Sequence, residues 1–253
     1  MCSVLLVFLV KKNNLCNFAE EFFFSKVIFL KLMNFMTANA TFYSSQDTFL
    51  VAVDCIIFGF KNDEMLLLCH KRAMEPAFGG FSLMGGFVKE NQSVNEAAIS
   101  VLSNLTGLEN IFMEQVGVYG EIDRDPGERV ISCAFYALID ISDNDKSLLE
   151  EHNAFWININ QAPELIFDHY QMVQDAITIL RRKAAIEPIG FNLLAEKFTL
   201  TQLQALYEAI YGQLFDKRNF RKKMTSLNFL EKTEEVDKSG SKKGAYLYKF
   251  KEQ

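Results

Sequence analysis

The chain has 253 residues, 49% of them hydrophobic, and a formal net charge of −6. This length predicts one or two domains, and the apolar fraction is large enough for a packed core. The five cysteines include no C-x-x-C pair, which excludes a cysteine-based metal framework and a disulfide ladder and favours free thiols in a cytoplasmic protein. They stand at positions 2, 16, 55, 69 and 133.

The charge is distributed unevenly along the chain. From residue 190 to 253, ten Lys and two Arg stand against eight Asp and Glu, a local charge of +4, so the other 189 residues carry −10. A basic C-terminal part on an acidic body predicts two modules with different partners.

Residues 1–45 do not match a targeting signal. The apolar run from Ser3 to Val10 is followed by Lys11-Lys12, whereas a signal peptide carries its positive charge first. The run is also too short to span a bilayer. We expect translation to begin at Met33 or Met36, with the upstream stretch an artefact of the assigned gene start; a membrane anchor is the functional alternative.

Three strands are predicted before the first helix. Residues 49–60 form a strongly apolar, β-branched run, and Asn62-Asp63 is a turn signal before a returning strand over residues 65–70. A further strand over residues 81–84 leads into Gly85-Gly86. A helix is then predicted over residues 94–106, because Ser93 and Glu96 match a capping box and Gly107 suits the position after the helix end.

The segment from Gly86 to Leu108 resembles the Nudix box, G-x5-E-x7-R-E-U-x-E-E-x-G-U, where U is aliphatic. The positions of its first Glu and its Arg hold Gln92 and Ser100, and its other three Glu positions hold Val101, Asn104 and Leu105. In a Nudix enzyme these carboxylates bind divalent metal ions, which prefer oxygen ligands. We therefore expect no metal, no cofactor and no enzymatic activity; an amphipathic core helix is the simpler interpretation of the same segment.

Strands are predicted next over residues 113–120, 130–139 and 153–159, and a helix over residues 168–185. This order resembles the Nudix α/β/α sandwich. Glu187-Pro188-Ile189-Gly190 is typical of a domain junction. The expected organisation is an N-terminal extension (1–45), a degenerate Nudix domain (46–187) and a second domain (188–253).

The second domain is predicted to be a winged helix-turn-helix, which gives an α+β fold class overall. A helix follows Thr199 and ends before Gly212, Asp216 caps a second helix over residues 217–227, and a hairpin with a Gly- and Lys-rich tip ends the chain. Cations on the second helix and on the wing suit duplex DNA, although a solvated basic helix beside a hairpin has the same pattern. The predicted DNA-binding residues are Lys217, Arg218, Asn219, Arg221, Lys222, Lys242 and Lys243.

A degenerate Nudix domain followed by a winged helix is similar to the Nudix-related transcriptional regulators. Within that group the runs 54–60, 82–88, 122–130, 187–194 and 206–212 resemble the arabinose-responsive AraR branch, which is related to the NrtR family. The resemblance implies a cytoplasmic homodimer that binds a double-stranded DNA operator as a repressor and is released by L-arabinose. No membrane partner is implied.

A sugar pocket needs carboxylate and guanidinium groups for hydroxyls and an apolar or aromatic face. The expected ligand-binding residues near the box are Phe81, Tyr119, Glu121, Asp123, Arg124 and Asp125. An exposed charged turn is the alternative interpretation of residues 123–128. The three His are dispersed, and we expect them to be structural or surface residues.

Three other functions fit the pattern. An ADP-ribose-responsive regulator of NAD metabolism could use Lys71, Arg72 and Arg124 for a diphosphate. A residual hydrolase could use carboxylates outside the motif, such as Glu90, Glu114 or Glu121. An interaction module would bind protein through its C-terminal domain, and its affinity for DNA would be absent or insensitive to salt.

Overall fold

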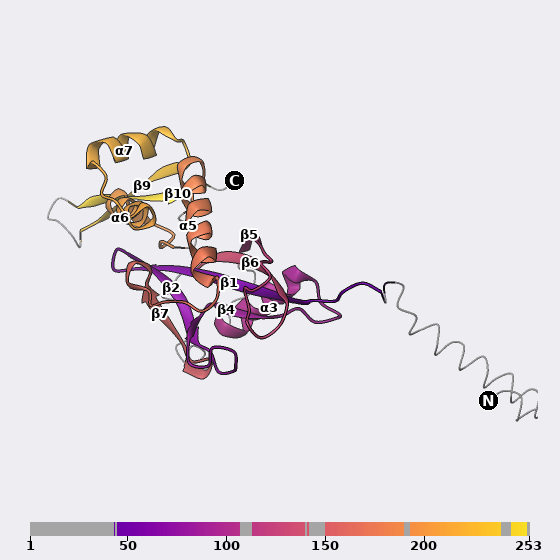
Figure 1. Cartoon of the computed structure of the whole chain (residues 1–253). Coiled ribbons are helices and arrows are strands. Elements are labelled where there is room, and N and C mark those ends of the chain that lie inside the picture. Colours follow the sequence, from indigo (N-terminus) through magenta and orange to yellow (C-terminus); the bar gives the residue numbers. More distant parts are fainter. Residues whose placement is uncertain are drawn as a thin grey trace, which may run out of the picture. The chain divides into compact units, whose positions relative to one another are not determined.

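The structure is a computed structural model that describes residues 43, 45–106, 113–139, 141, 150–189, 193–238 and 244–251. Residues 1–48 and 49–253 form two separate units, and every helix and strand described below belongs to the second (Figure 1). The expected translation start at Met33 or Met36 and the alternative of a membrane anchor concern residues 1–42, which lie outside the described residues. None of the described helices is long and apolar enough to cross a membrane.

The elements follow the predicted order closely. The strands and helices of the first part are β1 (Leu50–Lys61), β2 (Glu64–Lys71), β3 (Phe81–Ser82), β4 (Met84–Phe87), α3 (Val94–Thr106), β5 (Met113–Tyr119), β6 (Val130–Ile139), β7 (Ala154–Asn158), the short 3-10 helix η3 (Ile159–Gln161) and α5 (His169–Ile186). The second part has β8 (Phe198–Thr199), α6 (Leu200–Tyr211), α7 (Lys217–Ser226), β9 (Leu230–Asp237) and β10 (Ala245–Phe250).

Among the described residues, seven strands form one mixed sheet with the central order β3-β2-β1-β6-β5. β1 pairs parallel with β6 and antiparallel with β2 and β4, and β7 extends the sheet beside β2. β1 is buried from Val53 to Gly59 without alternation, as expected for a strand that is covered on both faces. This explains why its sequence is a continuous apolar run.

The predicted strand over residues 81–84 is two strands. Phe81 and Ser82 pair with β2, whereas Met84 begins β4 and pairs with β1. At the break, the Leu83 N–H donates to the Nδ1 atom of His169 at 3.2 Å instead of to a neighbouring strand. A side chain from a distant part of the chain therefore divides this segment, and local sequence pattern could not reveal it.

Each face of the sheet has its own apolar core. On one face α3 packs on β1 and β4, with Ala97, Ala98 and Leu102 buried. On the other face α5 packs on β1, β5 and β6, with Met172, Ala176 and Leu180 buried. Helices on both faces of a mixed sheet confirm the predicted Nudix α/β/α sandwich.

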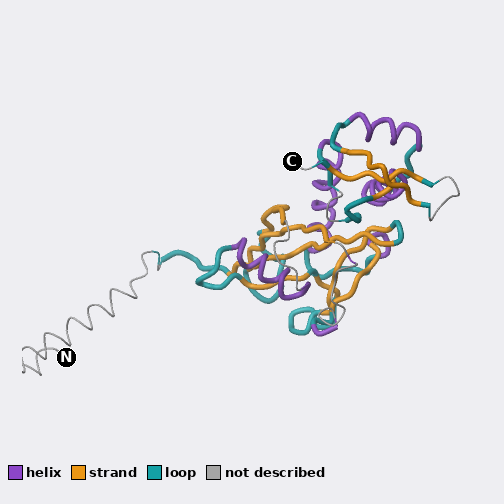
Figure 2. The backbone as a smooth tube through the Cα atoms, turned by 180° about the vertical axis from the view of Figure 1, so that it is seen from behind, coloured by secondary structure: helices purple, strands orange, loops and turns teal. Residues whose placement is uncertain are grey.

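The second part is a winged helix. β8, β10 and β9 form a three-stranded sheet beside α6 and α7 (Figure 2). Thr199 and Gln202 form a reciprocal capping box at the start of α6, and Gly212 ends the helix in a left-handed conformation with φ 67°. Asp216 Oδ1 accepts the Asn219 N–H at 2.9 Å and so caps α7. The predicted α+β fold class is confirmed.

Candidate functional site

The glycine pair at the start of the box lies against the central strand. β4 pairs with β1 so that Gly85 is opposite Asp54 and Gly86 is opposite Val53. A Cβ atom at Gly85 would lie 2.6 Å from Asp54 Oδ1 and 2.7 Å from the Val53 carbonyl oxygen. Glycine at this position therefore lets the backbone of the box approach the Asp54 carboxylate.

The box helix begins with the predicted cap. The Ser93 N–H and hydroxyl both donate to Glu96 Oε2 at 2.8 Å, and the Glu96 N–H donates to Ser93 Oγ at 3.2 Å. These hydrogen bonds lower the pKa of Glu96, and the one from the Ser93 backbone has the largest effect. This carboxylate is therefore engaged in holding the first turn of α3.

A neutral hydrogen bond joins the two positions where the Nudix box has Glu and Arg. Gln92 Nε2 donates to Ser100 Oγ at 3.1 Å, and that hydroxyl donates to the Glu96 carbonyl at 2.7 Å. On the following turns, Val101 packs against the core under α3 and Asn104 is exposed, while the side chain of Leu105 lies outside the described part of the chain. Across the described ranges, no group of three or more His, Cys, Asp or Glu could hold a metal ion.

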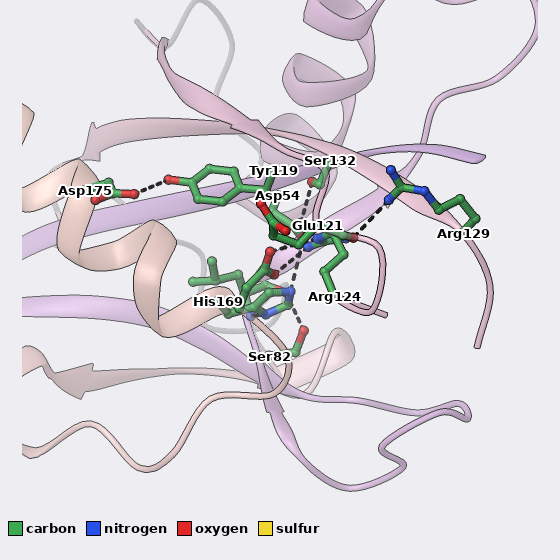
Figure 3. Close-up of polar contacts among 11 residues, drawn as sticks. Asp54, Ser82, Tyr119, Glu121, Arg124, Arg129, Ser132, His169 and Asp175 are labelled. Atoms are coloured by element: carbon green, nitrogen blue, oxygen red, sulfur yellow. Dashed lines mark hydrogen bonds and ion pairs between the residues drawn. The ribbon is translucent and has the colours of Figure 1, made fainter. Parts of the chain in front are cut away.

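A buried ion-pair network lies at the end of the sheet next to the box (Figure 3). Arg124 binds both carboxylate oxygens of Asp168, with Nε at 2.8 Å from Oδ2 and Nη2 at 2.7 Å from Oδ1. Nη2 also lies 3.5 Å from Asp54 Oδ2, which accepts the Ser132 hydroxyl at 2.6 Å. Arg124 is only 7% exposed, so its charge depends on these two carboxylates.

The net effect of this environment is to raise the pKa of Arg124. Burial acts to lower it, and the hydrogen bond and charge of Asp168, with help from Asp54 and Asp125, outweigh burial. The guanidinium is therefore a permanent buried cation. Removing one partner of such a pair typically destabilises a protein by about 3–5 kcal/mol, because the other charge stays buried.

His169 completes the network in its neutral form. Its Nδ1 accepts the Leu83 N–H, so the ring proton is on Nε2, which lies 3.5 Å from Asp54 Oδ1. Burial lowers the pKa of His169, although Asp54 and Asp168 act in the opposite direction. His169 as a whole residue is 3% exposed, so it is a buried part of the site and does not lie in a surface loop.

Two hollows meet at Arg124. The first has a volume of about 230 Å³ and brings Asp54, Arg72, Asp125 and His169 around the box glycines. The second, of about 540 Å³, is lined by Glu121, Ile122, Asp123, Arg124, Phe167 and Asp168. Arg124 and Phe167 line both. The two hollows therefore adjoin at a charged side chain and an aromatic ring.

The structure brings four of the six predicted ligand-binding residues to these hollows. Asp125 lines the first, Glu121 and Asp123 line the second, and Arg124 lines both. The other two lie elsewhere: Phe81 packs edge-on against Phe155 with ring centroids 5.7 Å apart, and the Tyr119 hydroxyl donates to Asp175 at 2.8 Å (Figure 3). Neither of them lines either hollow.

Sequence reasoning missed Asp54, Phe167, Asp168 and His169. Asp54 carried a usable signal, because a lone carboxylate inside a long apolar strand must have a buried partner. For Asp168 the sequence predicts only the start of a helix. Asp168 is the N-cap of α5 but makes no side-chain cap hydrogen bond, since Arg124 occupies both of its oxygens.

The second candidate surface is helix α7. Phe220 and Met224 are its buried residues, and the amide and cationic side chains predicted to bind DNA are exposed around them. The exposed residues are Lys217, Arg218, Asn219, Arg221 and Lys222. Lys242 and Lys243 lie outside the described residues.

Comparison with known proteins identifies both parts. Residues 48–176 match the NUDIX domain model, and residues 190–250 match the model of the NrtR DNA-binding winged helix domain. The chain is 30% identical over 205 residues to the "ADPR responsive transcriptional repressor NtrR" of Acinetobacter baylyi, covering 79% of this chain and 82% of that protein. It is 36% identical over 126 residues to an ADP-ribose pyrophosphatase of Methanocaldococcus jannaschii, covering 49% and 71%.

Among solved structures, Shewanella oneidensis NrtR in complex with a 27mer DNA is similar to this chain. It has 25% identity and a TM-score of 0.69, and the match covers 79% of this chain and 93% of that one. The arabinose-responsive branch predicted from the sequence has no support among these relatives. The chain belongs to the NrtR family of transcriptional regulators, in which a Nudix domain is followed by a DNA-binding winged helix.

Proposed function

We propose that this protein is a transcriptional repressor whose DNA binding is controlled by a small molecule bound in the Nudix domain. The observation that carries the proposal is the buried cation Arg124, which lies between two hollows beside a Nudix box that lacks its carboxylates. An anionic ligand that replaces a carboxylate partner of Arg124 can bind here without the metal ions that would hydrolyse it. The exposed cations of α7 supply the DNA-binding surface.

We propose ADP-ribose, or a closely related nucleoside diphosphate sugar, as the effector. The names of the Acinetobacter and Methanocaldococcus relatives both refer to this compound. The chemistry of the hollows supports it as well. Arg72 and Arg124 are suited to a diphosphate, while Phe167, whose ring lies 5.3 Å from the Arg72 guanidinium carbon, offers an aromatic face for a base. Two adjoining recesses suit a ligand with two halves.

L-arabinose is the second candidate. The first hollow has about 230 Å³, below the roughly 300–1,000 Å³ usual for ligand pockets, and this is a volume suited to a single sugar. Its lining combines Asp54, Asp125 and Arg124, which can bind adjacent hydroxyls. L-arabinose would leave the second hollow unoccupied, so we rank this sugar below ADP-ribose.

We further propose that the protein is not a hydrolase. Val101 carries no ligand atom, Asn104 offers only a neutral carbonyl oxygen, and Glu96 is engaged at the helix cap. Incubation with ADP-ribose and Mg²⁺ or Mn²⁺ is expected to release no AMP. Chelation with EDTA is expected to leave the affinity for ADP-ribose unchanged, and a metal-dependent release of AMP would refute this part of the proposal.

The experiment that tests the function is a fluorescence anisotropy titration of the full chain on duplex DNA from the promoters of its own neighbouring genes. The titration is repeated with ADP-ribose and with L-arabinose. Release by ADP-ribose alone is the expected result, and release by L-arabinose alone would assign the second candidate. DNA binding that does not respond to either compound would reject both effectors, and absence of DNA binding would favour an interaction module.

A further inference from the structure

Helix α5 begins at the effector pocket and ends at the DNA-binding domain. Its N-cap, Asp168, lines the second hollow and is held there by the Nε and Nη2 atoms of Arg124. The carboxylate of an N-cap Asp ordinarily accepts backbone N–H groups of its own helix, but the Asp168 side chain makes no such bond. The position of the first turn therefore depends on a side chain that belongs to the pocket.

The other end of α5 is attached to α6 of the winged helix by two reciprocal hydrogen bonds. Arg181 Nε donates to the Ile210 carbonyl at 2.8 Å, and the Tyr211 hydroxyl donates to the Arg181 carbonyl at 2.7 Å. Ile210 lies in the last turn of α6, where carbonyl groups have no partner within the helix and a guanidinium also complements the helix dipole. This contact fixes the end of α6 just before the turn that leads to α7.

Between these ends, α5 packs on β1, β5 and β6, and its polar side chains contact β5. The Tyr119 hydroxyl donates to Asp175, and Lys183 pairs with Glu114 at 2.5 Å. β5 is the last strand in the order of the sheet and also leads into the loop that carries Arg124. From Asp168 to Arg181 the helix spans about 20 Å at 1.5 Å per residue. A displacement of one end of this continuous helix is therefore carried to its other end.

We propose that α5 transmits effector occupancy to the DNA-binding domain, with Arg124–Asp168 as its input and Arg181–Ile210 as its output. The input responds to an anionic group of the ligand, because such a group competes with the Asp168 carboxylate for the Arg124 guanidinium. Release of Asp168 removes one of the contacts that hold the first turn of α5, beside those of His169 with Leu83 and Asp54, and the displaced helix carries the end of α6 with it. This inference rests on the proposed function, since it requires an effector in the hollows.

The output contact is tested with Arg181→Met and Tyr211→Phe in the full chain. Each change removes one of the two hydrogen bonds and keeps most of the side-chain bulk. Arg182→Met is the matched control, because Arg182 is an exposed cation on the same turn with no polar contact to another described residue. The affinity for ADP-ribose is measured by calorimetry without DNA, and the affinity for promoter DNA by anisotropy with and without saturating ADP-ribose.

Both output variants are expected to bind ADP-ribose within about twofold of wild type, since neither residue lines the hollows. The factor by which ADP-ribose weakens DNA binding, about 5–150-fold for typical couplings, is expected to fall toward one in both and to stay unchanged in the control. A wild-type factor in both Arg181→Met and Tyr211→Phe would overturn the inference alone. A wild-type chain whose DNA affinity ignores ADP-ribose would overturn the proposed effector, and the inference with it.

The input contact is tested with Asp168→Asn, which removes the charge that holds Arg124 and keeps the shape. Because loss of this charge also destabilises the fold, the comparison is made where circular dichroism shows the variant to be folded. Without ligand, the folded variant is expected to bind DNA as weakly as the wild type does with ADP-ribose bound. Asp47→Asn is the control, since Asp47 is an exposed carboxylate outside the network. Unchanged DNA affinity in Asp168→Asn would show that the ion pair does not control α5.

Discussion

At Gly85 the backbone of β4 approaches β1 too closely for any side chain. The nearest atoms are the Asp54 carboxylate, which Ser132 and Arg124 hold in place, and the carbonyl of Val53, which belongs to the central strand. Neither can move away freely. Glycine immediately before the Nudix-like motif is thus required here by packing.

We predict that Gly85→Ala destabilises the fold by about 1–3 kcal/mol, the usual range for overpacking. Urea denaturation measures the change in the free energy of unfolding. Gly86→Ala is a matched control in the same strand, because its Cβ would meet only Val101 Cγ2 at an ordinary 3.5 Å. Equal destabilisation by the two substitutions would contradict the packing argument.

His169 makes the stability of the protein depend on pH. Burial lowers its pKa below 6.5 in the folded chain, so the unfolded chain takes up a proton first as the pH falls. The groups around the ring have opposite charges: Asp54 and Asp168 favour protonation, and Arg124 and Arg72 oppose it. Stability is therefore complete above pH 6.5 and is lost as the pH falls from there toward the folded pKa.

We predict that unfolding free energies, measured in urea between pH 7.5 and pH 5.5, decrease below about pH 6.5 by up to roughly 1.4 kcal/mol per pH unit for this group. His169→Gln is expected to reduce that slope, and His70 accounts for part of what remains, since burial lowers its pKa as well. His152→Gln, in the turn before β7, is the comparison variant. An identical slope in His169→Gln and wild type would remove His169 as the cause.

At the level of elements, local chemistry determined what the sequence could predict. The caps at Ser93, Thr199 and Asp216 and the left-handed Gly212 were all readable, because each depends on residues within a few positions of one another. The Arg124 network could not be predicted from the sequence in this way. Its partners Asp54 and Asp168 lie 70 and 44 residues away along the chain, so only the fold brings them together. The chemistry of Phe81 and Tyr119 suits a sugar pocket, but packing and a hydrogen bond hold both side chains outside the hollows.

Helix α7 presents exposed cations that suit contact with DNA phosphates. Arg218 and Lys222 are exposed and one turn apart, so their side chains lie on one face of the helix. We predict that Arg218→Ala with Lys222→Ala weakens DNA binding and flattens its salt dependence. The slope of log affinity against log salt should fall by about 0.9 for each DNA phosphate that the variant no longer neutralises. Anisotropy titrations over a range of salt concentrations measure this slope.

Lys249→Ala is a suitable control for that measurement. Lys249 belongs to the same domain but pairs with Glu231 across the wing, with 3.4 Å between the charged atoms. Its removal is expected to leave the salt slope close to that of the wild type. If the α7 double variant retains the wild-type affinity and slope, α7 does not face the DNA.

At the level of the whole molecule, the sensing and DNA-binding parts share one apolar core. One cluster of buried residues includes Leu67 in β2 and Leu180 in α5. The same cluster contains Leu203 and Leu206 in α6 and Phe220 in α7. α6 packs directly on β2 and on α5. Residues 49–253 accordingly form one compact unit, although two family models describe its parts. A displacement of α5 would therefore change its packing against α6 of the winged helix.

A shared core predicts cooperative unfolding. We expect calorimetry of the full chain to give a single transition for the Nudix and winged-helix parts. Leu203→Ala, at a side chain with no exposed surface, should lower the whole transition and reduce stability by about 2–5 kcal/mol. Leu214→Ala removes the same groups from a side chain that is 88% exposed, and should change stability by less than about 0.5 kcal/mol. Two transitions, of which Leu203→Ala moves only one, would mean that the winged helix folds independently of the domain that senses the ligand.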